Sequence, residues 1–222
     1  MSDTIDRIGL KFFGAIAASI SHEIKNHMAI INEQAGLLED LIHMAERGAE
    51  IDAGRLKRLA ASVKSQVAQT DDIIRNMNRF AHAVSPHGQP TDLNDLLKLL
   101  TELCKRIADV QGVQVRLQPA PTAVNVPTSP FDLMNLIWLC LDKAMRSPAK
   151  GHELVLECEK TSRGASLRLK LDGSPDGLVT EAAAALADAL KAEIICDSAR
   201  KEIVISLPGN IKTGGVPAAS PQ

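Results

Sequence analysis

Apolar residues recur at intervals of three or four along the first part of the chain, with no proline among them. This spacing places them on one face of an α-helix. The pattern predicts one long amphipathic helix, which we expect to end at Arg47-Gly48 because a glycine lets the chain reverse. The stripe consists of Ile5, Ile8, Phe12, Ile16, Ile20, Ile24, Met28, Ile31, Ala35, Leu38, Ile42 and Ala45.

A second amphipathic stripe follows a break around Gly54. Its apolar residues run from Leu56 to Val84 at the same spacing, and Pro86 is expected to close it because proline cannot continue a helix. The two stripes together predict a helical hairpin domain over residues 1–86.

A hairpin of this kind needs a partner to cover its apolar stripes. A helix of about 40 residues is about 60 Å long, so two such helices form a rod too thin to bury both stripes. A second copy of the chain is the simplest partner, and it would give a homodimer with a four-helix bundle at its centre. Packing against the rest of the same chain is the alternative.

The segment SPHGQPTDL is rich in Pro and Gly and has no periodicity, so it is interpreted as a linker. Helices and short strands are mixed after it, which predicts a two-layer α/β sandwich over residues 87–207. The tail, residues 208–222, is rich in Gly, Pro, Ser and Ala and is expected to be disordered. We expect helices over 92–110, 130–146 and 180–191, and strands over 113–118, 122–126, 153–160, 165–171, 192–196 and 202–207.

Composition excludes several classes of function. The 25 basic and 27 acidic residues give a formal charge of -2, so nucleic acid is not an expected partner. There is no apolar run of about 20 residues to span a bilayer and no leader pattern, so we expect a cytoplasmic protein without a membrane partner. The cysteines lack metal or redox spacing and are interpreted as buried thiols. They are Cys104, Cys140, Cys158 and Cys196.

His22 is the first candidate for chemistry. It lies two positions from Ile20 and two from Ile24, roughly 200° around the helix from each, so it should face water. A solvated histidine is mostly neutral at physiological pH, which leaves one ring nitrogen with a lone pair able to attack phosphorus. Glu23 follows directly and is expected to hold the other ring nitrogen.

The neighbours of His22 at helical spacing are polar or small. Lys25 and Asn26 offer hydrogen-bond donors to phosphoryl oxygens, and the small side chains leave room for a second protein to approach. We expect this face to contact a phosphoryl group or its carrier. The small members are Ala15, Ala18, Ser19 and Ala29. The alternative is that His22 is one exposed polar residue among many.

The string AASISHEIKNHMAIINEQAGLL resembles the phosphoacceptor box of the dimerisation domain of histidine kinases, the HisKA type. The resemblance rests on the His-Glu pair and on the Asn four residues after the His. It implies that His22 is the phosphoacceptor, that Glu23 is the assisting base and that Asn26 influences dephosphorylation. The family usually has Pro after this Asn, and the chain has His27, so we expect a straighter helix here.

The resemblance extends over the second domain, which is similar to the GHKL-type ATPase domain of histidine kinases, in degenerate form. In FDLMNLIWLCLDKAM, Leu139 and Lys143 stand where the family carries two Asn, one of which holds magnesium. Leucine has no ligand atom and lysine would repel a metal. Shifting the register to Asn135 leaves its partner position apolar.

The turn LDGSPDGL is interpreted as a remnant of the adenine-contacting turn, and the next helix follows too soon for a glycine-rich lid. In this arrangement the chain resembles ChpT-like histidine phosphotransferases, the type to which it is closest. These relay phosphate between response regulator receiver domains without ATP. The resemblance implies no cofactor of the chain's own, with Mg²⁺ supplied by the receiver.

Three other interpretations stay open or are set aside. The chain could be a non-catalytic dimeric scaffold or regulator of a kinase or response regulator, or an ATP-using kinase with an unusual pocket. A zinc site is set aside because Asn26 stands where a zinc-protease helix needs its second His, and His27 is about 140° from His22. The remaining histidines are interpreted as surface residues: His43, His82, His87 and His152.

Overall fold

The computed structural model describes residues 2–84, 89–146 and 153–209. The chain forms two compact units. One is Phe13–Ala81, and the other combines Met1–Phe12 with His82–Gln222. Among the described helices, none has an apolar stretch long enough to cross a membrane.

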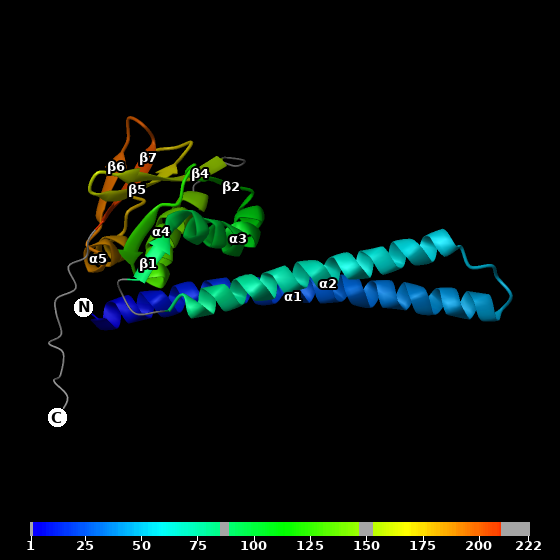
Figure 1. The fold of residues 1–222 in the computed structure, drawn as a ribbon. Helices are drawn as coiled ribbons and strands as arrows, with labels where there is room; N and C mark the ends of the chain where they lie inside the picture. Colours follow the sequence, from blue (N-terminus) through cyan, green and yellow to red (C-terminus); the bar gives the residue numbers. More distant parts are fainter. Residues whose placement is uncertain (1, 85–88, 147–152, 210–222) are drawn as a thin grey trace, which may run out of the picture. The chain divides into compact units, whose positions relative to one another are not determined.

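The unit Phe13–Ala81 is an antiparallel pair of helices, α1 (Ser2–Glu46) and α2 (Ala53–His82) (Figure 1). The chain reverses after α1 at Gly48, whose φ of 86° is a left-handed conformation that glycine adopts without strain. Asp52 begins α2, because its carboxylate accepts hydrogen bonds from two backbone N–H groups of the first turn. The predicted hairpin is confirmed.

Two contacts fix how α1 and α2 lie against each other. The rings of Phe13 and Phe80 stack with their centroids 5.5 Å apart. Further along the helix pair, towards the C-terminal end of α1, Nδ1 of His27 lies 2.6 Å from Oε1 of Gln66. The residue numbers of both pairs sum to 93, so a residue of α1 lies level with the residue of α2 that completes this sum.

The second unit contains a small and a large sheet with three helices. The two-stranded sheet pairs β1 with β3, and the five-stranded sheet has the order β2-β4-β5-β7-β6, in which only β2 and β4 are parallel. The elements are β1 (Gln89–Asp92), α3 (Leu93–Gln111), β2 (Gln114–Gln118), β3 (Asn125–Thr128), α4 (Pro130–Met145), β4 (Glu153–Thr161), β5 (Gly164–Lys170), α5 (Glu181–Ala189), β6 (Glu193–Asp197) and β7 (Glu202–Pro208).

The predicted fold class, a helical hairpin followed by a two-layer α/β sandwich, is confirmed. The three helices of this unit begin where the sequence offers a capping side chain. Asp92, Ser129 and Thr180 each accept a hydrogen bond from a backbone N–H in the first turn of α3, α4 and α5.

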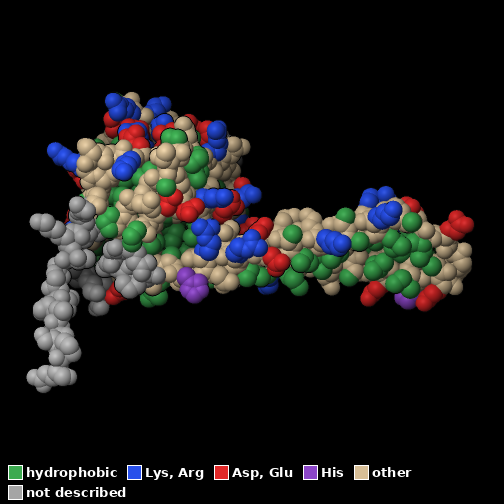
Figure 2. Space-filling model, in the orientation of Figure 1, with side chains coloured by type: hydrophobic (Ala, Val, Ile, Leu, Met, Phe, Trp, Pro, Cys, Tyr) green, Lys and Arg blue, Asp and Glu red, His purple; other side chains and the backbone are tan. Residues whose placement is uncertain are grey.

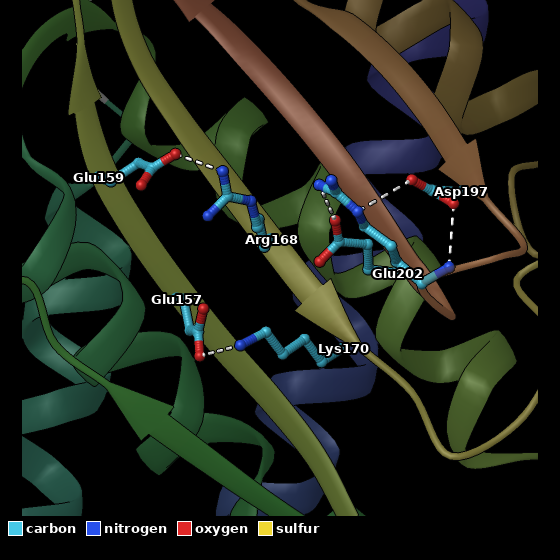
Figure 3. Close-up of polar contacts among 7 residues, drawn as sticks. Glu157, Glu159, Arg168, Lys170, Asp197 and Glu202 are labelled. Atoms are coloured by element: carbon cyan, nitrogen blue, oxygen red, sulfur yellow. Dashed lines mark hydrogen bonds and ion pairs between the residues drawn. The ribbon is translucent and has the colours of Figure 1, made fainter.

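The large sheet has one apolar and one charged face. Along β4, buried Leu154, Leu156 and Cys158 alternate with more exposed residues, and Figure 1 shows α3, α4 and α5 on one side of the sheet. The other face carries ion pairs between β4 and β5, and between the turn that joins β6 to β7 and the ends of these two strands (Figure 3). Lys170 lies 2.6 Å from Glu157, Arg168 pairs with Glu159, and Arg200 contacts Asp197 and Glu202.

The segment predicted as a linker contains a strand, so the prediction is wrong for this part. Residues 85–88 lie outside the described residues, but Gln89–Asp92 form β1 and pair with β3 in antiparallel register, Pro90 opposite Pro127. A four-residue strand containing proline gives no alternating pattern, so only its partner reveals it. Of the tail predicted to be disordered, Pro208 belongs to β7 and residues 210–222 lie outside the described residues.

The first turns of α1 belong to the α/β unit. The Phe12 side chain is 1% exposed, and its ring lies 5.5 Å from that of Phe131 and 6.0 Å from that of Trp138, both on α4. A Cβ added at Gly9 would come within 3.2 Å of the Phe131 ring. Three of the chain's few aromatic residues thus form one cluster, and Gly9 allows helix α1 to approach the Phe131 ring closely.

Candidate functional site

His22 lies on α1 within the hairpin unit, and its side chain is exposed, as the helical spacing predicted. Among the described residues, none forms a hydrogen bond or an ion pair with its ring. Both ring nitrogens are therefore open to solvent or to an incoming group. An exposed imidazole with a free lone pair is competent as a nucleophile toward an electrophilic phosphorus.

The side chains around His22 form an exposed strip on α1. Lys25 and Asn26 are exposed, and Glu23 is half-buried without a hydrogen bond to His22. The assisting role predicted for Glu23 therefore stays a prediction. The small residues at helical spacing from His22 are exposed too: Ala15, Ala18 and Ala29. The side chains of the strip are small or polar, so another protein surface can approach the imidazole.

Ser19 does not share this exposure. Ser19 is 8% exposed, although helical spacing predicted that it shares the exposed face of His22. At about 100° per residue, Ser19 lies about 60° from His22 but also about 60° from Ile16, which is fully buried. Ser19 therefore lies at the border of the buried stripe, and it is buried together with Ile16.

His27 is a residue whose contact the sequence did not indicate. It is half-buried and bonded to Gln66 of α2, so it ties the two helices together below His22. A histidine within an apolar stripe, matched by a glutamine in the stripe of the facing helix, is the signal that could have identified the pair. His43 and His82 are exposed, as predicted, and His87 and His152 lie outside the described residues.

Helix α4 carries the three positions that were compared with the family's magnesium-holding Asn residues, and these positions differ in exposure. Leu139 is half-buried and Lys143 is exposed. Asn135 is completely buried, and neither its Oδ1 nor its Nδ2 has a hydrogen-bond partner among the described residues. An unpaired buried amide is costly, because it loses its hydrogen bonds to water without replacing them.

Replacing Asn135 with Leu is therefore expected to stabilise the protein by about 1–3 kcal/mol, since it removes the cost of the unpaired amide while filling a similar volume. Chemical unfolding followed by circular dichroism would measure the change. Leu136, equally buried but apolar, serves as the control position, where Leu136→Ala should destabilise by about 2–5 kcal/mol. A loss of stability in Asn135→Leu would show that the amide is paired, for example by a buried water molecule.

The turn between β5 and α5 uses its acidic residues internally. The Asp172 carboxylate accepts a hydrogen bond from the backbone N–H of Glu153 at 2.9 Å. Asp176 accepts hydrogen bonds from the hydroxyls of Ser198 and Ser174, and these bonds lower the pKa of its carboxyl group. These contacts make the turn a structural link between β4, β5 and β6.

The cysteines do not contribute a reactive thiol to the site. Burial raises the pKa of Cys104 and raises that of Cys140 to about 12, so neither thiol ionises near neutral pH. Cys158 is also buried, whereas Cys196 is only half-buried, which corrects the expectation that all four are buried. Within the part of the chain that the structure describes, no group of three His, Cys, Asp or Glu side chains could hold a metal ion.

No protein-family model matches the sequence, and no curated protein matches it. Solved structures similar to the chain include the histidine kinase AdeS of Acinetobacter baumannii, with 16% identity, a TM-score of 0.49, and coverage of 86% of this chain and 98% of that chain. A bacterial phosphotransferase has 16% identity and a TM-score of 0.45, covering 87% of this chain and 94% of that one. The histidine kinase ThkA, in complex with the response regulator protein TrrA, has 12% identity and a TM-score of 0.46, covering 90% of this chain and 63% of that one. At these identities the similarity concerns the fold.

Proposed function

We propose that the chain is a histidine phosphotransferase of a two-component phosphorelay, with His22 as the residue that carries the phosphoryl group. The observation that carries the proposal is the exposed imidazole of His22, which no described residue binds, on a strip of small and polar side chains. The partners are response regulator receiver domains. The resemblance of the surrounding sequence to a phosphoacceptor box supports this assignment of roles.

The chemistry is a transfer between two side chains. A ring nitrogen of His22 attacks the phosphorus of a receiver's aspartyl phosphate, so an N–P bond forms while the bond from phosphorus to the carboxylate oxygen breaks. The carboxylate leaves, and Glu23 stabilises the positive charge that the imidazole gains. A second receiver's aspartate then takes the phosphoryl group by the reverse reaction. A magnesium ion bound by the receiver would supply the charge that neutralises the phosphoryl oxygens, so the proposed relay asks for no cofactor on this chain.

A second copy of the chain completes the proposed assembly. Several large apolar side chains of the hairpin are exposed on one face, and Figure 2 shows hydrophobic side chains gathered along it. Covering them with the same face of another chain would bury both stripes in a four-helix bundle. The exposed residues of this apolar face are Met28 at 54%, Leu38 at 41%, Ile42 at 47%, Val67 at 46% and Ile74 at 44%.

The relay we propose acts in the cytoplasm and without ATP. Four unpaired cysteines suit a reducing compartment. The side chains at positions 139 and 143 offer no oxygen ligand for a magnesium ion that would bridge ATP phosphates.

Incubation of the purified protein with a phosphorylated receiver domain, without ATP, tests the proposal. We expect label to move from the receiver to this chain in a linkage that is labile to acid and stable to alkali, as a phosphoramidate is. A calorimetric titration with magnesium and ATP, run in parallel, is expected to give no saturable heat. Receiver binding without any transfer would overturn the proposal and identify a non-catalytic scaffold, and saturable ATP binding would favour a kinase.

A further inference from the structure

Several charged side chains border the apolar face of the hairpin, and we call four of them the rim charges: Lys25 and Glu39 on α1, Lys57 and Asp71 on α2. All four are exposed, and none of them forms an ion pair or hydrogen bond with another described residue. Charges elsewhere on α2 do find partners in the chain, such as Asp72 and Arg75 at 3.0 Å.

The helical phase explains why the rim charges stay unpaired within one hairpin. At about 100° per residue, Lys25 lies about 160° from His27 around α1, and Asp71 lies about 140° from Gln66 around α2. His27 and Gln66 mark the line along which the two helices touch. The rim charges thus point away from that line, beyond the exposed apolar residues on each helix.

Each rim charge on α1 lies at nearly the same height along the helix axis as a rim charge of opposite sign on α2. Residues level with each other have numbers that sum to 93. The numbers of Lys25 and Asp71 sum to 96, and so do those of Glu39 and Lys57. Each pair is therefore three residues from level, about 4.5 Å along the axis, which long side chains span. Both pairs join opposite charges.

We propose that a second copy packs on the apolar face in parallel orientation and that two reciprocal ion pairs set its register, Lys25 with the partner's Asp71 and Glu39 with the partner's Lys57. A two-fold axis along the rod keeps residues at their own height and brings α1 beside the partner's α2, so the two rims meet. This inference rests on the dimeric part of the proposed function. The partner then contributes a charge beside Lys25, three positions from His22.

A dimer with antiparallel hairpins is disfavoured by Lys64, a further exposed charge that lies midway between Lys57 and Asp71 on α2. Such a dimer places α2 against the partner's α2, and the register that pairs Lys57 with the partner's Asp71 sets Lys64 against the partner's Lys64. Like charges that face each other are destabilising. In the parallel arrangement Lys64 faces the partner's Asn32, because 32 and 64 also sum to 96. The pattern along both rims therefore selects the parallel dimer, as charges beside a coiled-coil seam select a partner.

Charge reversal in the full chain tests the proposal by sedimentation velocity. Glu39→Lys creates two repulsive contacts per dimer and is expected to weaken dimerisation by about tenfold at low salt, less at high salt. Adding Lys57→Glu to this variant should restore the wild-type dissociation constant. The matched control is Glu39→Lys with Lys25→Glu, which has the same net charge and should stay at least as weak as the single variant.

Restoration by Lys25→Glu instead of Lys57→Glu would overturn the proposal in favour of antiparallel hairpins. A dimer of unchanged strength in all three variants would overturn it too, because the rim charges would then not meet. In both cases the wild-type chain is dimeric and the proposed dimer survives. A wild-type chain that stays monomeric at all concentrations would overturn both, while transfer to His22 is measured separately.

Discussion

Replacing His22 with Ala is expected to reduce phosphoryl uptake from a phosphorylated receiver to background, a loss of at least about 100-fold. The reason is that the transfer needs a nucleophile with a free lone pair at an accessible position, and alanine has none. Because His22 is exposed and unbonded to described residues, its removal should leave the fold intact. Label transfer measured over time, with circular dichroism of each variant, would check both statements.

His43→Ala is the matched control for this experiment. His43 lies on the same helix and is also exposed, but its Nδ1 is 3.1 Å from Oε2 of Glu46 and it has no strip of small residues around it. The His43→Ala variant should keep wild-type uptake. Label that persists in His22→Ala and disappears in His43→Ala would place the phosphoacceptor at His43 and refute the assignment.

Replacing Phe12 with Ala is expected to lower the free energy of unfolding by about 3–5 kcal/mol. Its ring is buried at 1% exposure against Phe131 and Trp138, so its removal leaves a cavity that helix α4 cannot close. Urea unfolding followed by Trp138 fluorescence would measure the change at the cluster itself, because Trp138 is the chain's one tryptophan.

Leu10→Ala provides the comparison for Phe12→Ala. Leu10 is two positions earlier on α1 and 72% exposed, so its truncation should change stability by less than about 0.5 kcal/mol. Equal losses in the two variants would show that general weakening of α1, and not the aromatic cluster, determines the effect.

The hairpin was predictable because its signal is local. The apolar spacing of three and four and the glycine at position 48 predict where α1 runs and reverses, and the structure places its end at Glu46. The capping residues of α3, α4 and α5 act on the next turn of the same helix, so their effect also appears in the sequence.

The candidate site was predictable to the same extent. Exposure of His22, Lys25 and Asn26 follows from helical phase, and the structure agrees. Ser19 was misplaced because a residue about 60° from two faces is decided by what packs on the helix, and phase alone does not say this. The bond from His27 to Gln66 joins residues 39 positions apart, which no local pattern reveals.

By itself, the sequence determined the helices, the exposed histidine and the order of elements in the α/β unit, since each depends on residues within a few turns of one another. Only the tertiary structure decided that the Pro-containing segment before α3 becomes a strand on β3, that β2 runs parallel to β4, and that Phe12 belongs to the α/β unit. The physical reason is that strand pairing and aromatic packing take their free energy from partners distant in the chain. The helical periodicity of the apolar residues does not show which distant residues these partners are.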